Sequence, residues 1–94
     1  LTFRDFRYTT KDGALYAFVM EWPKKHQNPI ILPNLTIMNQ RISAITSVEL
    51  LGHDDSIEWE NHGDGLHVTF PKKKPCDHAY ALKIRFAKPI KSAL

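Results

Sequence analysis

Two carboxylates flank a tryptophan at Glu58-Trp59-Glu60, the arrangement in this sequence closest to an acid–base pair. An active-site pair in which one carboxyl group is a nucleophile and the other an acid needs the two about 5 Å apart, with one pKa raised. In an extended strand, side chains two residues apart lie roughly 7 Å apart on the same side. We therefore interpret Glu58 and Glu60 as a solvated polar face and expect no catalytic residue in this chain.

The two tryptophans, Trp22 and Trp59, are the residues best suited to stack on a sugar ring. Alternation with Glu58 and Glu60 directs Trp59 to the opposite side of its strand, into the core. Trp22 ends an apolar run beside Pro23, where an exposed ring is compatible with the sequence. Trp22 and Trp59 are thus the candidate carbohydrate-binding residues if the chain captures glycans itself.

The five histidines do not form a metal-binding motif. No pair has the helical i, i+4 spacing or the cysteine-linked spacing that is typical of zinc sites. His53 with Asp54 and Asp55, and His62 with Asp64, offer adventitious ligands, although ordinary turn polarity accounts for both. We expect no metal and no cofactor.

The segment around the single cysteine, Cys76, combines residue types that could suggest a thiol nucleophile. His78 lies two residues away, but the sequence offers nothing that would form an oxyanion hole. One cysteine cannot close an internal disulfide. Asp77, between Cys76 and His78, is expected to accept hydrogen bonds from backbone N–H groups at the start of a strand. Asp77→Ala would therefore lower the stability of the fold by about 1 kcal/mol.

Charge is divided along the chain rather than concentrated in a nucleic-acid-binding stripe. The net charge is +3, with six acids and no Lys or Arg in residues 49–64. Residues 72–91 hold seven basic residues and one acid. No apolar run is long enough to span a membrane. We expect neither nucleic acid nor a membrane as a partner.

Strand-like segments recur at short intervals with turn residues between them, and no segment has helical periodicity. Asp12-Gly13 predicts a tight hairpin, and residues 61–65 predict a Gly-rich one. The expected strands cover residues 3–10, 14–22, 45–51, 56–60, 66–70 and 80–86, and an edge strand or irregular loop lies within 26–41. This pattern predicts an all-β, two-layer antiparallel β-sandwich, immunoglobulin-like, with about seven to eight strands.

Alternation also predicts which side chains face the core. The nearly continuous apolar run in 14–22 indicates a central strand covered on both faces, and Thr46 is expected to face inward with Val48. We expect a single domain over residues 1–88 and a tail at 89–94. The predicted core comprises Phe6, Tyr8, Phe18, Val48, Leu50, Trp59, Leu66, Val68, Phe70, Tyr80, Leu82 and Ile84.

Four ordered segments resemble the C-terminal β-sandwich domain of the α-L-fucosidase family of glycoside hydrolases. They are residues 5–11, 15–23, 45–52 and 74–84, whereas Glu21 stands where that family usually has glycine. The resemblance implies an upstream catalytic (β/α) barrel in the same polypeptide, and a parent that is a secreted, periplasmic or lysosomal retaining hydrolase. None of the catalytic carboxylates of that family falls within this chain.

Two functions follow from these expectations. The first is a non-catalytic accessory domain that packs on the upstream barrel. Its docking patch is expected near strand ends or in residues 29–37, where Ile30, Ile31, Leu35 and Ile37 exceed what a small core needs. The alternative is a carbohydrate-binding module that binds glycans through exposed rings.

Overall fold

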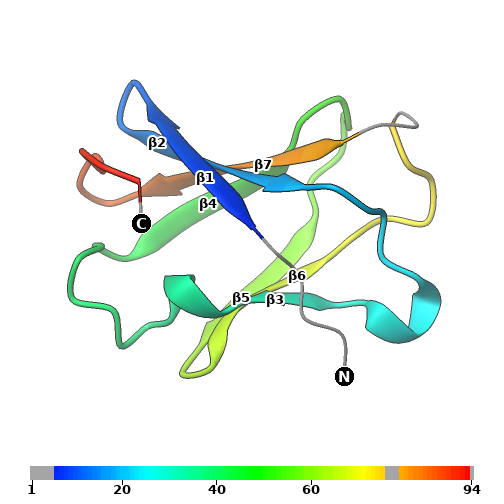
Figure 1. Ribbon diagram of the computed structural model, residues 1–94, viewed down its shortest axis with the longest axis horizontal. Coiled ribbons are helices and arrows are strands. Elements are labelled where there is room, and N and C mark those ends of the chain that lie inside the picture. Colours follow the sequence, from blue (N-terminus) through cyan, green and yellow to red (C-terminus); the bar gives the residue numbers. More distant parts are fainter. Residues whose placement is uncertain (1–5, 76–78, 94) are drawn as a thin grey trace.

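Seven antiparallel strands form two facing sheets in the computed structural model, which describes residues 6–75 and 79–93 (Figure 1). The four-stranded sheet has the order β1-β2-β7-β4, and the three-stranded sheet has the order β3-β6-β5. In chain order, the strands and 3₁₀ turns are β1 (Arg7–Lys11), β2 (Ala14–Val19), η1 (Lys25–Gln27), β3 (Ile30–Leu32), η2 (Pro33–Leu35), β4 (Ile45–Leu50), β5 (Glu58–His62), β6 (Gly65–Thr69) and β7 (Tyr80–Phe86).

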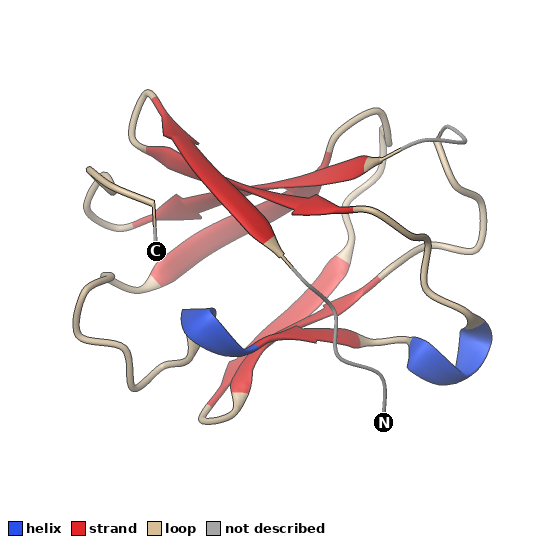
Figure 2. Cartoon of the chain, in the orientation of Figure 1, coloured by secondary structure: helices blue, strands red, loops and turns tan. Residues whose placement is uncertain are grey.

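The predicted all-β sandwich is confirmed, and the helical content of the described residues is limited to two short 3₁₀ turns (Figure 2). The sheets pack face to face through one side of each strand. Two-residue alternation explains this arrangement, because it sends every second side chain of a strand to the same face. The fully buried side chains include Leu15, Leu32, Leu35, Leu66, Val68, Leu82 and Ile84.

Most of the predicted core is confirmed. Two-thirds of the predicted residues are buried, and Phe6, Tyr8 and Trp59 are partly buried and pack against the same cluster. β7 matches its prediction along its whole length, with its inward side chains buried and Arg85 exposed. The buried members of the prediction are Val48, Leu50, Leu66, Val68, Phe70, Tyr80, Leu82 and Ile84.

The prediction that Phe18 lies in the core is wrong. In β2 the buried face is formed by Leu15, Ala17 and Val19, and Phe18 is half-buried on the other face. When a strand is apolar at every position, its sequence does not show which alternate residues face the core. In β2 this is set by pairing with β7, where Ala17 lies opposite the fully buried Leu82.

The inward orientation predicted for Thr46 is also wrong. A β-bulge between Ile45 and Ser47 shifts the register of β4 against β7. Ile45 is therefore buried and Thr46 exposed, whereas Val48 and Leu50 beyond the bulge keep the expected alternation. A bulge places two residues opposite one, so simple alternation fails at that point.

Both predicted hairpins are present. Asp12 and Gly13 have φ values of 52° and 82°, which fits the type I′ turn that suits the twist of the β1–β2 pair. The second hairpin is tighter than predicted, because His62 pairs with Gly65 and leaves a two-residue turn.

Of the two alternatives predicted for residues 26–41, an edge strand or an irregular loop, the structure has a short edge strand, β3, which pairs with β6. It is anchored by a side chain that sequence reasoning did not single out. The Asn28 Nδ2 group donates to the Phe70 carbonyl, and Asn28 Oδ1 accepts from the Phe70 N–H, both at 2.9 Å. The Asn28 amide thus satisfies both backbone polar groups of Phe70 just beyond the end of β6.

Gly65, at the start of β6, is required by a close approach between strands. Its φ is 142°, and a Cβ there would lie 2.6 Å from the Leu32 carbonyl oxygen. We predict that Gly65→Ala destabilises the domain by roughly 1–3 kcal/mol from the backbone conformation alone, with the clash adding to it. Gly63→Ala is the matched control, because a Cβ at Gly63 meets nothing within 4 Å. Chemical denaturation of both variants checks this; equal midpoints would contradict it.

The Tyr8 hydroxyl is buried, and among the described residues it has no hydrogen-bond partner. Burial raises the pKa of Tyr8 to about 12, against about 10 in an unfolded chain. The folded state therefore keeps its proton longer, and stability falls as pH rises from about 10 to about 12.

We predict that Tyr8→Phe is neutral or stabilising at neutral pH, because it removes an unsatisfied buried group. It should also remove this alkaline loss, whereas Tyr16→Phe retains it. Thermal unfolding between pH 7 and 11 tests both expectations. A clear loss of stability in Tyr8→Phe at pH 7 would refute the interpretation.

Candidate functional site

Trp22 lies in an aromatic cluster at one end of the sandwich. Its ring is half-buried and meets the rings of Phe70 and Tyr80 edge-on, at centroid distances of 5.0 and 4.9 Å. These contacts give Trp22 a packing role in the core, and they occupy part of its ring. Its part in carbohydrate binding stays a prediction.

Trp59 and its two flanking carboxylates lie as the alternation predicted. Glu58 and Glu60 are exposed on the outer face of the three-stranded sheet, and Trp59 is partly buried and packs against the core. An open hollow of about 540 Å³ lies beside them, lined by residues that include Trp59, Pro29 and His67. Trp59 is therefore the candidate tryptophan with a recess next to it.

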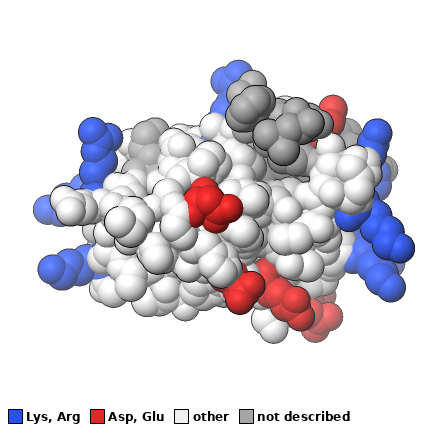
Figure 3. All heavy atoms as spheres, turned by 90° about the horizontal axis from the view of Figure 1, so that it is seen from below, with Lys and Arg blue, Asp and Glu red and all other residues white. Residues whose placement is uncertain are grey.

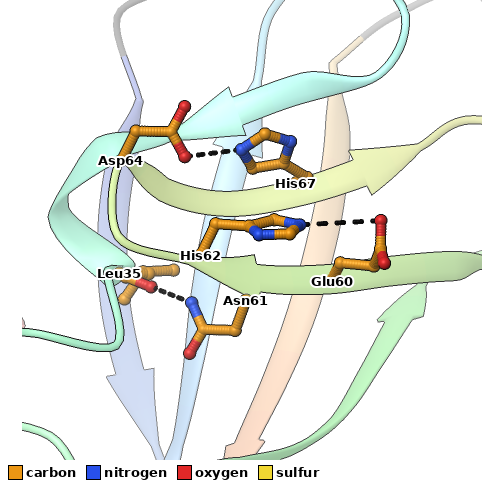
Figure 4. A network of polar contacts seen from close by, with 6 residues as sticks. All are labelled: Leu35, Glu60, Asn61, His62, Asp64 and His67. Atoms are coloured by element: carbon orange, nitrogen blue, oxygen red, sulfur yellow. Dashed lines mark hydrogen bonds and ion pairs between the residues drawn. The ribbon is translucent and has the colours of Figure 1, made fainter.

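A cluster of two carboxylates and two histidines lies on the same outer face, at the β5–β6 hairpin (Figure 4). Asp64 Oδ1 accepts a 2.7 Å hydrogen bond from His67 Nε2, and Glu60 Oε2 lies 3.6 Å from His62 Nε2. The two imidazole rings meet edge-on, with centroids 4.5 Å apart. We call Glu60, His62, Asp64 and His67 the hairpin cluster.

The pairing within the hairpin cluster differs from the one considered from sequence. Asp64 bonds to His67 rather than to His62, because the tight turn brings Asp64 back over β6. His67 lies directly opposite Glu60 in the ladder and diagonally across from His62. Sequence reasoning passed over His67. The signal for it was the tight turn, which fixes which side chains face each other.

The pKa of Asp64 is lowered, chiefly by the hydrogen bond from His67. Desolvation opposes this shift, and the charge of His67, a backbone hydrogen bond and, least of all, the charge of His62 add to it. A general acid at neutral pH needs a carboxyl whose pKa is raised instead. The environment of Asp64 therefore favours a permanent carboxylate that organises the hairpin.

Metal ligands do not gather in the described part of the chain. Among residues 6–75 and 79–93, no group of three His, Cys, Asp or Glu side chains is placed to hold an ion. Cys76 and His78, considered above for thiol chemistry, lie outside the described residues. Asp77 does too, so the structural role expected for it stays a prediction. No helix in the described chain has the length and apolar character needed to cross a bilayer.

The four isoleucines and leucines expected to exceed the needs of the core divide into two pairs. Ile30 and Leu35 are core residues, so the prediction is wrong for them. The η2 turn directs Leu35 inward, and Asn61 Nδ2 donates to its carbonyl at 2.6 Å. Ile31 and Ile37 are 41% and 61% exposed, and their part in docking stays a prediction.

Figure 3 shows the molecule from below, with acidic side chains near the middle and along the lower edge of a mostly uncharged face, and lysines and arginines mainly at its left and right margins. The sequence explains this distribution, because β3, β5 and β6 contain no Lys or Arg and their hairpin supplies Glu58, Glu60 and Asp64. The ionised side chains of this sheet and its hairpin are therefore carboxylates.

The fold defines the class of the protein, a two-sheet antiparallel β-sandwich domain with one continuous core. A family model described as "Alpha-L-fucosidase C-terminal domain" matches residues 2–85, almost the whole chain. The chain therefore belongs to the α-L-fucosidase C-terminal domain family.

Two curated relatives are full α-L-fucosidases of much greater length. The chain is 30% identical over 83 residues to "Alpha-L-fucosidase" of Branchiostoma floridae, which covers 83% of this chain and 17% of that protein. It is 26% identical over 82 residues to "Tissue alpha-L-fucosidase" of Rattus norvegicus, covering 82% and 16% respectively. The chain thus spans about one sixth of the length of these relatives.

The hairpin cluster makes a testable prediction about titration. In the folded domain the carboxyl of Asp64 should titrate below its ordinary range, and His67→Ala should move that midpoint upward. His62→Ala should move it less, since His62 contributes least to the lowered pKa. Carboxyl carbon NMR chemical shifts followed from pH 2 to 6 measure both.

The sign of the linked stability follows from the same shift. A lowered folded-state pKa gives stability that is present above the unfolded pKa, about 3.9, and lost as pH falls through the folded value. An Asp64 midpoint unchanged by His67→Ala would contradict the assignment of the hydrogen bond as its cause.

Proposed function

We propose that this chain is a non-catalytic accessory domain of a fucoside-cleaving glycoside hydrolase, and that it packs on and stabilises a catalytic (β/α) barrel in the same polypeptide. The observation that carries the proposal is the match of residues 2–85 to the C-terminal domain of α-L-fucosidases, combined with relatives of whose length the match covers only 16–17%. The relatives have ample length for a catalytic domain beyond the matched span.

The environment of the carboxylates supports this assignment. Glu58 and Glu60 are exposed on a polar sheet face, where water solvates both carboxyl groups. Asp64 is held in its charged form by His67. Glycoside hydrolysis needs one carboxyl in an apolar setting that keeps it protonated near neutral pH. These surroundings favour a structural over a catalytic role.

A second candidate function is direct glycan capture, and one observation favours it. The hollow beside Trp59 is bordered by Glu60, His67 and Thr69, polar groups of the kind that bind sugar hydroxyls. The ring of Trp59, however, packs partly against the core, which limits the face that a sugar could stack on. Structural packing is therefore the function we favour.

We predict that the 94-residue chain neither hydrolyses a fluorogenic aryl α-L-fucoside nor binds fucose. Fluorescence should stay at the buffer rate, and calorimetric titration with fucose and fucosylated oligosaccharides should give only heats of dilution. The longer polypeptide that carries the domain serves as the positive control for hydrolysis.

Trp59→Ala and Trp22→Ala distinguish the two candidate functions. Saturable glycan binding at micromolar concentration that is lost in Trp59→Ala would establish the carbohydrate-binding alternative. Because Trp22 packs on Phe70 and Tyr80, Trp22→Ala should lower thermal stability, and a loss of binding in that variant must be read against its melting temperature.

A further inference from the structure

The outer face of the four-stranded sheet carries an apolar row that the described residues leave partly open. Phe18 on β2 lies opposite Ala81 on β7, and the Leu51 N–H donates to the Ala81 carbonyl at 3.0 Å. Met20 lies one residue beyond the end of β2, and continued strand alternation would place it on the same side as Phe18. Leu51 is 43% exposed and Met20 is 62% exposed. We call Phe18, Met20, Leu51 and Ala81 the outer row.

The sequence of β2 indicates that the outer row is buried by another surface. An antiparallel strand with one solvated face normally alternates apolar and polar residues, whereas a strand buried on both faces is apolar throughout. β2 is apolar at every position, with Leu15, Ala17 and Val19 facing the three-stranded sheet. Its other face therefore has the composition of a buried surface while Phe18 remains half-exposed.

The charges around the outer row indicate what kind of surface would cover it. The four strands of this sheet carry a single acid, Glu49, and its carboxylate lies 3.7 Å from Nε of Arg85. Their remaining charges are positive, with Arg7 opposite Phe18 and Lys83 over the ring of Tyr16, while Glu21, beyond the end of β2 and next to Met20, adds one exposed acid. The three-stranded sheet has acids and no Lys or Arg, so the two outer faces differ in sign.

We propose that the outer row is the docking surface for the catalytic domain of the same polypeptide, which meets it with an apolar patch rimmed by acidic side chains. The inference rests on the proposed accessory function and adds to it the face that is used. The relatives are much longer than the matched span, which leaves room for a catalytic domain that could cover this face. The positive side chains of the sheet favour acidic side chains on that domain. Contact of this kind buries the apolar centre and pairs the cations around it.

The two methionines of the chain provide a built-in test. Met20 lies in the outer row, and Met38 is 74% exposed on the loop after η2. Both should be oxidised readily by dilute peroxide in the 94-residue chain, since thioether oxidation follows exposure. In the longer polypeptide, Met20 should react at least about fivefold more slowly, while Met38 keeps its rate. Mass spectrometry of tryptic peptides gives both rates.

The outcomes separate the docking face from the accessory function. Protection of Met38 without Met20 would overturn the outer row and keep the packing function. Protection of neither, together with independent unfolding of the two domains, would overturn both. Protection of Met20 in the 94-residue chain that grows with its concentration would make a second copy the occupant and refute the proposal.

A matched pair of substitutions provides a second measurement. Leu51→Asp and Ile31→Asp alter residues of nearly equal exposure, 43% and 41%, on opposite outer faces. In the longer polypeptide, Leu51→Asp should restore Met20 oxidation to the rate seen in the 94-residue chain, and Ile31→Asp should not. Circular dichroism of each variant verifies the fold. Restoration by Ile31→Asp alone would contradict the proposal.

Discussion

Burial of the inward side of β7 between β2 and β4 is the interaction on which the rest of the structure depends. Tyr80, Leu82, Ile84 and Phe86 all face the core, and Leu82 and Ile84 have no exposed surface. Each such side chain contributes about 1.5–3 kcal/mol by leaving water. Because β7 pairs on both sides, its register fixes which residues of β2 and β4 face inward. The three-stranded sheet then packs onto a surface that is already defined.

The three-stranded sheet depends more on particular backbone contacts than on strand length. β3 has three residues, and it is positioned by the amide clamp between Asn28 and Phe70 and by the close approach of Gly65 to Leu32. A short edge strand needs such anchors, because its own ladder supplies few hydrogen bonds. The outward side of this sheet is consequently free to be polar, and the hairpin cluster occupies it.

The two outer faces of the sandwich therefore serve different purposes in our interpretation. The outer face of the three-stranded sheet carries carboxylates, and these lack the apolar surroundings that glycoside hydrolysis requires. The face of the four-stranded sheet combines an apolar row with a basic rim, which is the composition of a surface that meets another protein surface. An accessory domain needs this asymmetry, since it has to present one face to its partner and the other to water.

The sequence by itself determined the fold class, the tight hairpin at Asp12-Gly13, the alternation along β7, and the likeness to α-L-fucosidases. These features depend on local chemistry or on residues in order along the chain. The tertiary structure alone decided the phase of β2, the bulge that exposes Thr46, the clamp at Asn28, and the pairing of Asp64 with His67. The physical reason is that each of these depends on strand register, and register is set by which strands pair across the sheet rather than by neighbours in sequence.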